Sequence, residues 1–153
     1  MLPKWHVFLS FLFAYIIYWF TTITIFQAVL IFLAAVLIDI DHYLFYIIIK
    51  KRFSLRSSYE WFKIRRDKLL QLSPKERRKH KQCILIFHGI EPIIILFLLA
   101  KFFPFISYIT IGFIFHIISD LIIEFKEGLA HYKLSVIYQI YDYVSKRKMK
   151  HIV

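Results

Sequence analysis

The sequence predicts an all-α integral membrane protein with about four transmembrane helices. Hydrophobic residues make up 59% of its 153 positions, more than the roughly half that is usual in soluble domains. These residues gather in long runs, and about 20 consecutive apolar residues suffice for one helix to cross a bilayer. Four such spans would use about half of the chain. We therefore expect a single integral membrane domain over residues 1–153.

The first apolar run extends from about Trp5 to Ile40. It is too long for one ordinary span of about 17–25 residues and suits two short ones. Thr21 and Thr22 mark the expected turn. A single steeply tilted helix is the alternative interpretation. A short apolar extension over residues 43–49 follows the run and is too short to span a membrane.

A strongly basic segment follows at about residues 50–82. Its thirteen Lys and Arg stand against three acids, which accounts for +10 of the net charge of +11. Short cytoplasmic loops carry such an excess, so the segment is expected inside the cell. Binding to anionic lipid headgroups, to an acidic protein or to nucleic acid is the alternative interpretation. Tyr59, Trp61 and Phe62 lie among its basic residues, which is typical of a helix in the headgroup layer.

The remaining sequence predicts two more spans and an interfacial tail. Cys83–Phe103 is expected to be one span, kinked at Pro92 because proline has no N–H for the carbonyl of His88. Phe105–Phe125 is expected to be another span. From about residue 128 to 153, apolar residues recur at three-to-four spacing before a basic cluster, which predicts an amphipathic helix. With both basic segments inside, a multi-pass protein of the inner or plasma membrane has both termini in the cytoplasm.

Several ionisable residues lie within or at the rim of the apolar runs, and each acid has a histidine nearby. An ionised carboxylate at the bilayer centre costs at least about 2.5–3.5 kcal/mol on insertion scales, so we expect a partner for each. In the predicted topology all of them fall on the cytoplasmic side, the later pairs roughly 6–12 Å below the surface. These residues are Asp39, Asp41, His42, His88, Glu91, His116 and Asp120.

Their spacing favours a metal site. His88 and Glu91 are three residues apart, and a pair at that spacing shares one face of a helix. His116 and Asp120 are four apart, and helical bundles build metal sites from such pairs. Nitrogen and oxygen ligands without thiolate suit zinc, manganese or iron, and magnesium less well. The candidate ligands of this divalent ion are Asp39, Asp41, His88, His116 and Asp120.

The individual residues of this pattern are expected to have different roles around the ion. Asp39 and Asp41 are two residues apart, so they converge only if the helix ends there or if one binds the ion while the other orients a histidine. His42 is a candidate orienting residue or proton shuttle, and Glu91 a candidate ligand or general base. A bound divalent ion lowers the pKa of water from 15.7 toward about 7, which generates a hydroxide nucleophile.

The order of these motifs resembles a known family. Leu37–His42, then Phe87–Glu91, then His116 with Asp120 resemble the membrane-bound metal-dependent hydrolases, also described as LexA-binding, inner-membrane-associated hydrolases. That family typically carries a Pro-Asp-x-Asp-His-like element, a His-Ser element and a His-x-x-x-Asp element. Here isoleucine and glycine replace the proline and the serine. The resemblance covers most of the chain and implies a metal-dependent hydrolase.

We therefore expect hydrolysis of a lipid-like or phosphoester substrate at the cytoplasmic face, with the basic segment holding an anionic headgroup. An ion or proton conduit is the first alternative, because intramembrane acids and histidines also form relays. The outer halves of the predicted spans are nearly bare of ionisable groups, which argues against a conduit. The second alternative is a membrane-tethered protein whose basic segment binds an acidic partner or DNA.

Overall fold

The computed structural model describes residues 3–128, 134–146 and 149, and the described residues form helices with no strand among them. The expected all-α fold is confirmed. The chain divides into two compact units, which are described separately. Unit 1 contains residues 1–38 and 90–126, and unit 2 contains residues 39–89 and 127–153. The expectation of a single domain over residues 1–153 stays a prediction.

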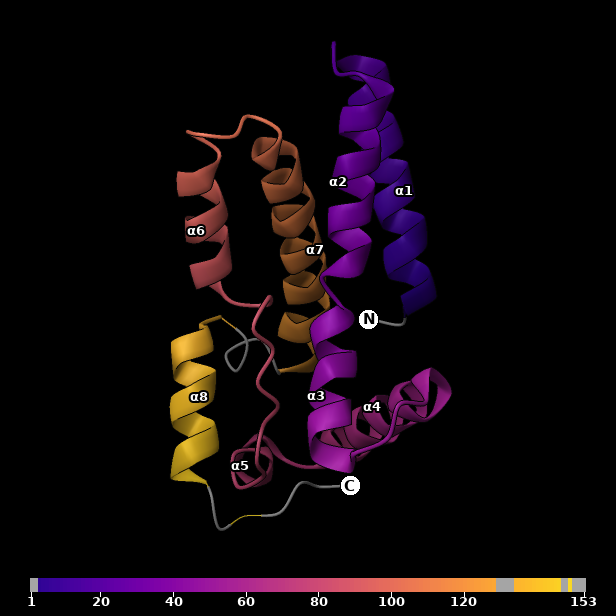
Figure 1. Ribbon diagram of the computed structural model, residues 1–153. Coiled ribbons are helices and arrows are strands. Elements are labelled where there is room, and N and C mark those ends of the chain that lie inside the picture. The colour runs from indigo at the N-terminus through magenta and orange to yellow at the C-terminus, as the bar shows by residue number, and fades with distance from the viewer. Residues whose placement is uncertain (1–2, 129–133, 147–148, 150–153) are drawn as a thin grey trace. The chain divides into compact units, whose positions relative to one another are not determined.

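Unit 1 begins with a helical hairpin, in which α1 and α2 run side by side (Figure 1). The side chain of Thr24 accepts a hydrogen bond from the Gln27 N–H at 3.3 Å, and the Gln27 side chain accepts one from the Thr24 N–H at 2.7 Å. This capping box starts α2 after the turn at residues 21–24. The predicted hairpin is confirmed, and the single tilted helix is not formed. The unit's helices are α1 (Pro3–Phe20), α2 (Ile25–Leu37), α6 (Ile90–Leu99) and α7 (Ile106–Glu127).

Helix α7 approaches the backbone of α2 closely at Gly112. A Cβ atom at this position would lie 2.9 Å from the Cβ of Ala34 and 3.0 Å from the backbone nitrogen of Ala35. It would lie closer still to the carbonyl oxygen of Ile31. Small residues allow such close approach between membrane helices, where van der Waals contact replaces the hydrophobic effect as the driving force. Glycine is therefore required for this helix pair to pack as it does.

Within the described residues, two stretches are long and apolar enough to cross a membrane, Ile25–Lys50 and Ile106–Glu127. Only 33% and 22% of the residues in their most apolar windows are buried, whereas the core helix of a soluble protein would be largely buried. The second stretch agrees with the predicted span Phe105–Phe125. Helices α1 and α6 are apolar but shorter than these two stretches.

The predicted span Cys83–Phe103 is wrong at its beginning, because α6 begins only at Ile90 and ends at Leu99. Pro92 therefore lies in the first turn of α6 rather than in its interior. The N–H groups of a first turn have no acceptor within the helix, so a proline there removes no hydrogen bond. The predicted kink at Pro92 is wrong for the same reason.

Residues 81–89 are not helical, because side chains of unit 2 bind their backbone. The Leu85 N–H donates to Oε1 of Gln139 at 2.6 Å. The Phe87 N–H donates to Oδ2 of Asp41 at 3.0 Å. These bonds replace the helical i to i−4 bonds that the two N–H groups would otherwise make. An apolar sequence that would suit a helix is thus held in an irregular conformation.

Unit 2 contains helices over most of the basic segment, as its aromatic residues predicted. Phe45 and Tyr46 of α3 and Trp61 of α4 form the buried centre of this unit, with Cys83 and Tyr143 packed against it. The core thus lies where α3 and α4 meet. The unit's helices are α3 (Ile40–Lys50), α4 (Leu55–Gln71), α5 (Pro74–Arg77) and α8 (Val136–Ser145).

Two arginines of the basic segment have a structural role. Arg65 is 4% exposed and its Nη2 donates to the carbonyl of Lys81 at 2.7 Å. Arg77 is 9% exposed and donates hydrogen bonds to backbone carbonyls at helix ends, where the helix itself supplies no N–H donor. These acceptors are the carbonyl oxygens of Leu70, Leu72 and Glu127. Part of the basic charge therefore holds the backbone of unit 2 together.

Helix α8 confirms the predicted amphipathic tail over the residues that are described. Its polar side is buried at Gln139 and Asp142, while Ile137, Tyr141 and Val144 are more than 60% exposed. A helix with this pattern turns its apolar side outward, the reverse of a soluble protein. The rest of the predicted tail, residues 129–133, 147–148 and 150–153, lies outside the described residues.

Candidate metal centre

The first candidate ligands lie at the start of α3, in unit 2. Helix α2 ends at Leu37, and Asp39 immediately precedes the first residue of α3. The two acids of the Asp-x-Asp pair are therefore separated by a helix start, which is one of the two arrangements that the sequence left open. Asp41 lies in the first turn of α3, where the helix dipole stabilises a carboxylate.

Asp41 is the most enclosed acid of this cluster and holds two histidines. It is 2% exposed. Its Oδ2 lies 2.9 Å from Nδ1 of His88 and accepts from the N–H of Phe87, and its Oδ1 lies 3.0 Å from Nδ1 of His42. A carboxylate only accepts hydrogen bonds, so both imidazoles carry a proton on Nδ1. In the neutral rings Nε2 then has the lone pair that binds a metal.

Asp39 is placed differently from Asp41. Its Oδ1 lies 3.4 Å from Nε2 of His88 and 3.4 Å from Nδ1 of His42. An N–H···O hydrogen bond is usually about 2.7–3.2 Å long. Two ligands that each lie about 2.1 Å from a tetrahedral ion are about 3.4 Å apart. The distance from Asp39 to Nε2 of His88 therefore suits two ligands that share an ion, whereas His42 faces Asp39 with the Nδ1 that donates to Asp41.

Asp39, His42 and His88 form a set that could hold a metal ion, since each offers a ligand atom within 4.8 Å of the others. The side chains of Asp39 and His42 are 29% and 24% exposed, whereas those of His88 and Asp41 are 2% exposed. The set is thus buried on one side and open on the other. Asp41 lies behind both histidines, as carboxylates do that orient metal ligands. His42 is thus also a candidate ligand through Nε2, and its expected role as an orienting residue or proton shuttle stays a prediction.

His116 and Asp120 form a second cluster, in unit 1, on the buried face of α7. His116 is completely buried, and its Nδ1 lies 2.7 Å from the carbonyl oxygen of Ala35 on α2. Because a carbonyl only accepts, this nitrogen carries the proton, and Nε2 faces Oδ2 of Asp120 at 3.8 Å. The two residues share one helical face, as their spacing predicted. That face also contains Thr110, Gly112 and Glu124.

His6 of α1 completes this second cluster and was not predicted. Its Nε2 lies 3.1 Å from Oδ1 of Asp120, and its ring stacks on that of His116 with centroids 4.3 Å apart. A signal was present in the sequence. His6, Ser10 and Ala14 recur at four-residue spacing and are all buried, and a histidine inside an apolar span is itself unusual.

Glu91 is the one predicted residue that neither cluster includes. Glu91 is in the first turn of α6 and belongs to unit 1, whereas His88 precedes that helix and belongs to unit 2. The expectation that His88 and Glu91 share one helical face is wrong, because the chain is not helical at His88. The expectation that all the predicted ligands bind a common ion stays a prediction.

Comparisons of the chain with protein-family models, with curated proteins and with solved structures gave no match. The resemblance to the membrane-bound metal-dependent hydrolases therefore stays a prediction from short motifs. Any function must be argued from the chemistry of the clusters themselves.

Proposed function

We propose that the chain is a metal-dependent hydrolase of the inner or plasma membrane that acts at the cytoplasmic face. The observation that carries this proposal is the arrangement of Asp39, His42 and His88 around a common centre, with Asp41 behind both histidines. The substrate class is a phosphoester or acyl-type bond in a lipid-like molecule. The exposed apolar side chains of the helices support a protein that meets its substrate in the membrane.

The proposal includes a multi-pass topology of four spans with both termini in the cytoplasm. Helix α7 and the stretch Ile25–Lys50 have the required length. Helix α6, with 10 residues, is only about 15 Å long and covers about half of the hydrocarbon layer. A crossing at α6 would therefore need residues beyond the ends of this helix. The outward apolar side of α8 would lie on the inner surface.

The residues of unit 2 can perform defined parts of such a reaction. A divalent ion, when bound, supplies a water molecule of lowered pKa and polarises the bond that is cleaved. Asp39, His42 and His88 would hold that ion, and their nitrogen and oxygen atoms suit zinc, manganese or iron, with magnesium a weaker candidate. Asp41 keeps both imidazoles in the tautomer that binds metal. The partial exposure of Asp39 and His42 leaves a side from which substrate can approach.

Other predicted roles rest on the sequence pattern. Glu91 is the proposed general base, and His116 and Asp120 are proposed as further ligands. His80 has no assigned role, and its imidazole is absent from the candidate ligand sets formed by the described residues. It therefore provides a matched control histidine within unit 2.

Metal content of the purified full-length protein tests the proposal. We expect at least one transition metal ion per chain by elemental mass spectrometry, lost in Asp39→Asn and in His88→Gln but retained in His80→Gln. The same measurement on His116→Gln and Asp120→Asn tests the sequence prediction for those two residues. Stoichiometric metal in His88→Gln, with the fold intact by circular dichroism, would overturn the assignment of the centre.

Hydrolysis is tested separately from binding. Metal-loaded protein in detergent is expected to cleave a chromogenic phosphodiester, and the activity should disappear with a chelator and return on adding the metal. Metal binding without hydrolysis of phosphoester or acyl substrates would retain the centre and reject the enzyme.

A proton conduit is the second candidate function, and the cluster in unit 1 favours it. His6, His116 and Asp120 are buried next to one another, and such groups carry protons in membrane transporters. Proton uptake into liposomes that contain the protein, lost in Asp120→Asn, would replace the hydrolase proposal if no hydrolysis is found.

A further inference from the structure

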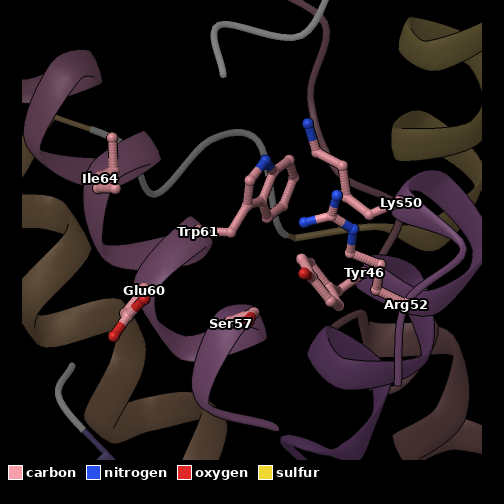
Figure 2. A pocket seen from close by; sticks show the side chains of 7 residues that line it. All are labelled: Tyr46, Lys50, Arg52, Ser57, Glu60, Trp61 and Ile64. Carbon is pink, nitrogen blue, oxygen red and sulfur yellow. The ribbon is translucent and has the colours of Figure 1, made fainter. Parts of the chain in front are cut away.

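A pocket of about 440 Å³ lies between α3 and α4 in unit 2 (Figure 2). Its volume falls within the range of about 300–1,000 Å³ that is usual for sites of small ligands. Lys50 and Arg52 contribute two positive charges to its lining, and Tyr46 and Ser57 contribute hydroxyl groups. The indole of Trp61 forms one wall. The pocket is separate from the residues proposed to bind metal.

The local sequence explains how this pocket forms. Lys51 has a φ of 55°, the left-handed conformation that ends many helices, and terminates α3. The side chain of Ser54 then caps α4 by accepting from the N–H of Ser57 at 3.2 Å. The chain thus changes direction within a few residues. Arg52 lies in this short turn, so that cationic side chains from α3 and from the turn face α4.

The charges inside the pocket are mainly positive. Figure 2 shows the side chains of Lys50 and Arg52 directed toward Trp61, while Glu60 points away from them. The Lys50 ammonium lies 5.6 Å from the centre of a Trp61 ring, a cation–π distance. Glu60 accepts a hydrogen bond from Nε of Arg56 at 3.0 Å. Its negative charge is therefore compensated outside the pocket.

The position along the chain indicates the environment of the pocket. Lys50 is the last residue of the apolar stretch that is long enough to cross a membrane, and basic and aromatic residues at such an end lie at the level of lipid headgroups. Ile48, Phe53 and Leu55, close by in sequence, are more than 60% exposed. An acyl chain would cover such apolar side chains while a headgroup occupies the pocket.

We propose that this pocket binds the phosphate group of an anionic membrane lipid. Lys50 and Arg52 contact the phosphate oxygens, where charge-assisted hydrogen bonds are strongest. The hydroxyls of Tyr46 and Ser57 donate hydrogen bonds to the remaining phosphate oxygens. The site does not depend on the proposed hydrolase function, because none of these residues belongs to the candidate metal centre.

Binding to the full-length protein in a neutral detergent tests the proposal. The probes are dihexanoyl phosphatidylglycerol, dihexanoyl phosphatidylcholine and inorganic phosphate, with affinity measured by thermophoresis. Phosphatidylglycerol is expected to bind at least about tenfold more tightly than either of the others. Arg52→Gln should weaken it about tenfold, which is the loss of one charge-assisted contact of about 1.4 kcal/mol. Lys50→Gln should weaken it similarly.

Lys63→Gln is the matched control, because Lys63 is an exposed lysine of α4 outside the pocket lining, and its loss changes the net charge equally. We expect less than a twofold effect from it. Equal weakening by Lys63→Gln and Arg52→Gln would overturn the site, since diffuse charge would then explain the binding. If inorganic phosphate binds as tightly as phosphatidylglycerol, the proposal that the ligand is a lipid is wrong. His88→Gln should bind the lipid normally, so a failed metal centre leaves this test intact.

Discussion

Replacing Gly112 by alanine is the sharpest test of how unit 1 is packed. The added Cβ would meet atoms of three α2 residues, two of them backbone atoms. Backbone atoms cannot rotate away as the end of a flexible side chain can. Helices α7 and α2 must therefore separate to accept a single methyl group.

The size of this separation follows from the distances. Ordinary van der Waals contact begins at 3.4 Å, whereas the new Cβ would lie 2.9 Å from the Cβ of Ala34 and closer to the Ile31 carbonyl. The helices must therefore move apart by more than 0.5 Å. His116 lies one turn further along α7, and its bond of 2.7 Å to the carbonyl of Ala35 would stretch toward the limit of about 3.2 Å.

These effects combine to a moderate loss of stability. Overpacking costs about 1–3 kcal/mol and weakening the bond of His116 about 0.5–1.5 kcal/mol. Alanine recovers up to about 1 kcal/mol, because it favours the helix over glycine. With the full recovery, we expect Gly112→Ala to lower the free energy of unfolding by roughly 0.5–3.5 kcal/mol. Valine at the same position should prevent the two helices from packing at all.

Thermal unfolding of the purified protein in detergent, followed by far-ultraviolet circular dichroism, measures this loss. The midpoint should fall by roughly 1–14 °C. Ile114→Val changes a similar volume at an exposed position of α7 and should change stability by less than about 0.5 kcal/mol. If the alanine variant is as stable as the unmodified chain, α2 and α7 do not approach as described and the reasoning fails.

Two further predictions concern unit 2. Asp41→Asn should weaken metal binding about 10–100-fold without abolishing it, because Asp41 orients the histidine ligands. Competition with a chelator measures this affinity. Complete loss of metal binding would instead show that Asp41 is itself a ligand. Arg77→Lys should destabilise the protein by about 1–3 kcal/mol, because a single ammonium cannot reach three separate carbonyls. Urea unfolding measures the effect of Arg77→Lys. Arg78→Lys is the control, because Arg78 is exposed and lies next to Arg77. Equal stability of the two variants would show that the carbonyl contacts of Arg77 contribute nothing.

The parts of the fold that were predictable depend on local sequence. The hairpin of α1 and α2 follows from an apolar run that is too long for one span and a Thr-rich turn. The extent of α7 follows from the run itself. The start of α6 was not predictable, because the residues before it are apolar and would suit a helix. Side chains from Asp41 and Gln139, distant in sequence, hold that segment out of helical conformation.

The candidate site, like the fold, was only partly predictable from local sequence. The pattern of acids and histidines identified Asp39, Asp41 and His88, but their roles depend on a helix break at residues 38–39. No glycine or proline marks this break in the sequence, so propensity alone could not place it. His6 was missed because its acidic partner, Asp120, is on a different helix, and pair spacing detects only partners on the same helix.

The acids at the rim of the apolar runs differ in whether they need a metal ion as a partner. Asp41 is satisfied by the protein itself, since a backbone N–H and two imidazole nitrogens lie within 3.0 Å of its oxygens. A buried carboxylate with such donors needs no ion to offset its desolvation. Asp39 is the acid whose distance to Nε2 of His88 suits a shared ion. The case for a metal therefore depends on Asp39 and the histidine nitrogens around it, rather than on the number of acids in the apolar runs.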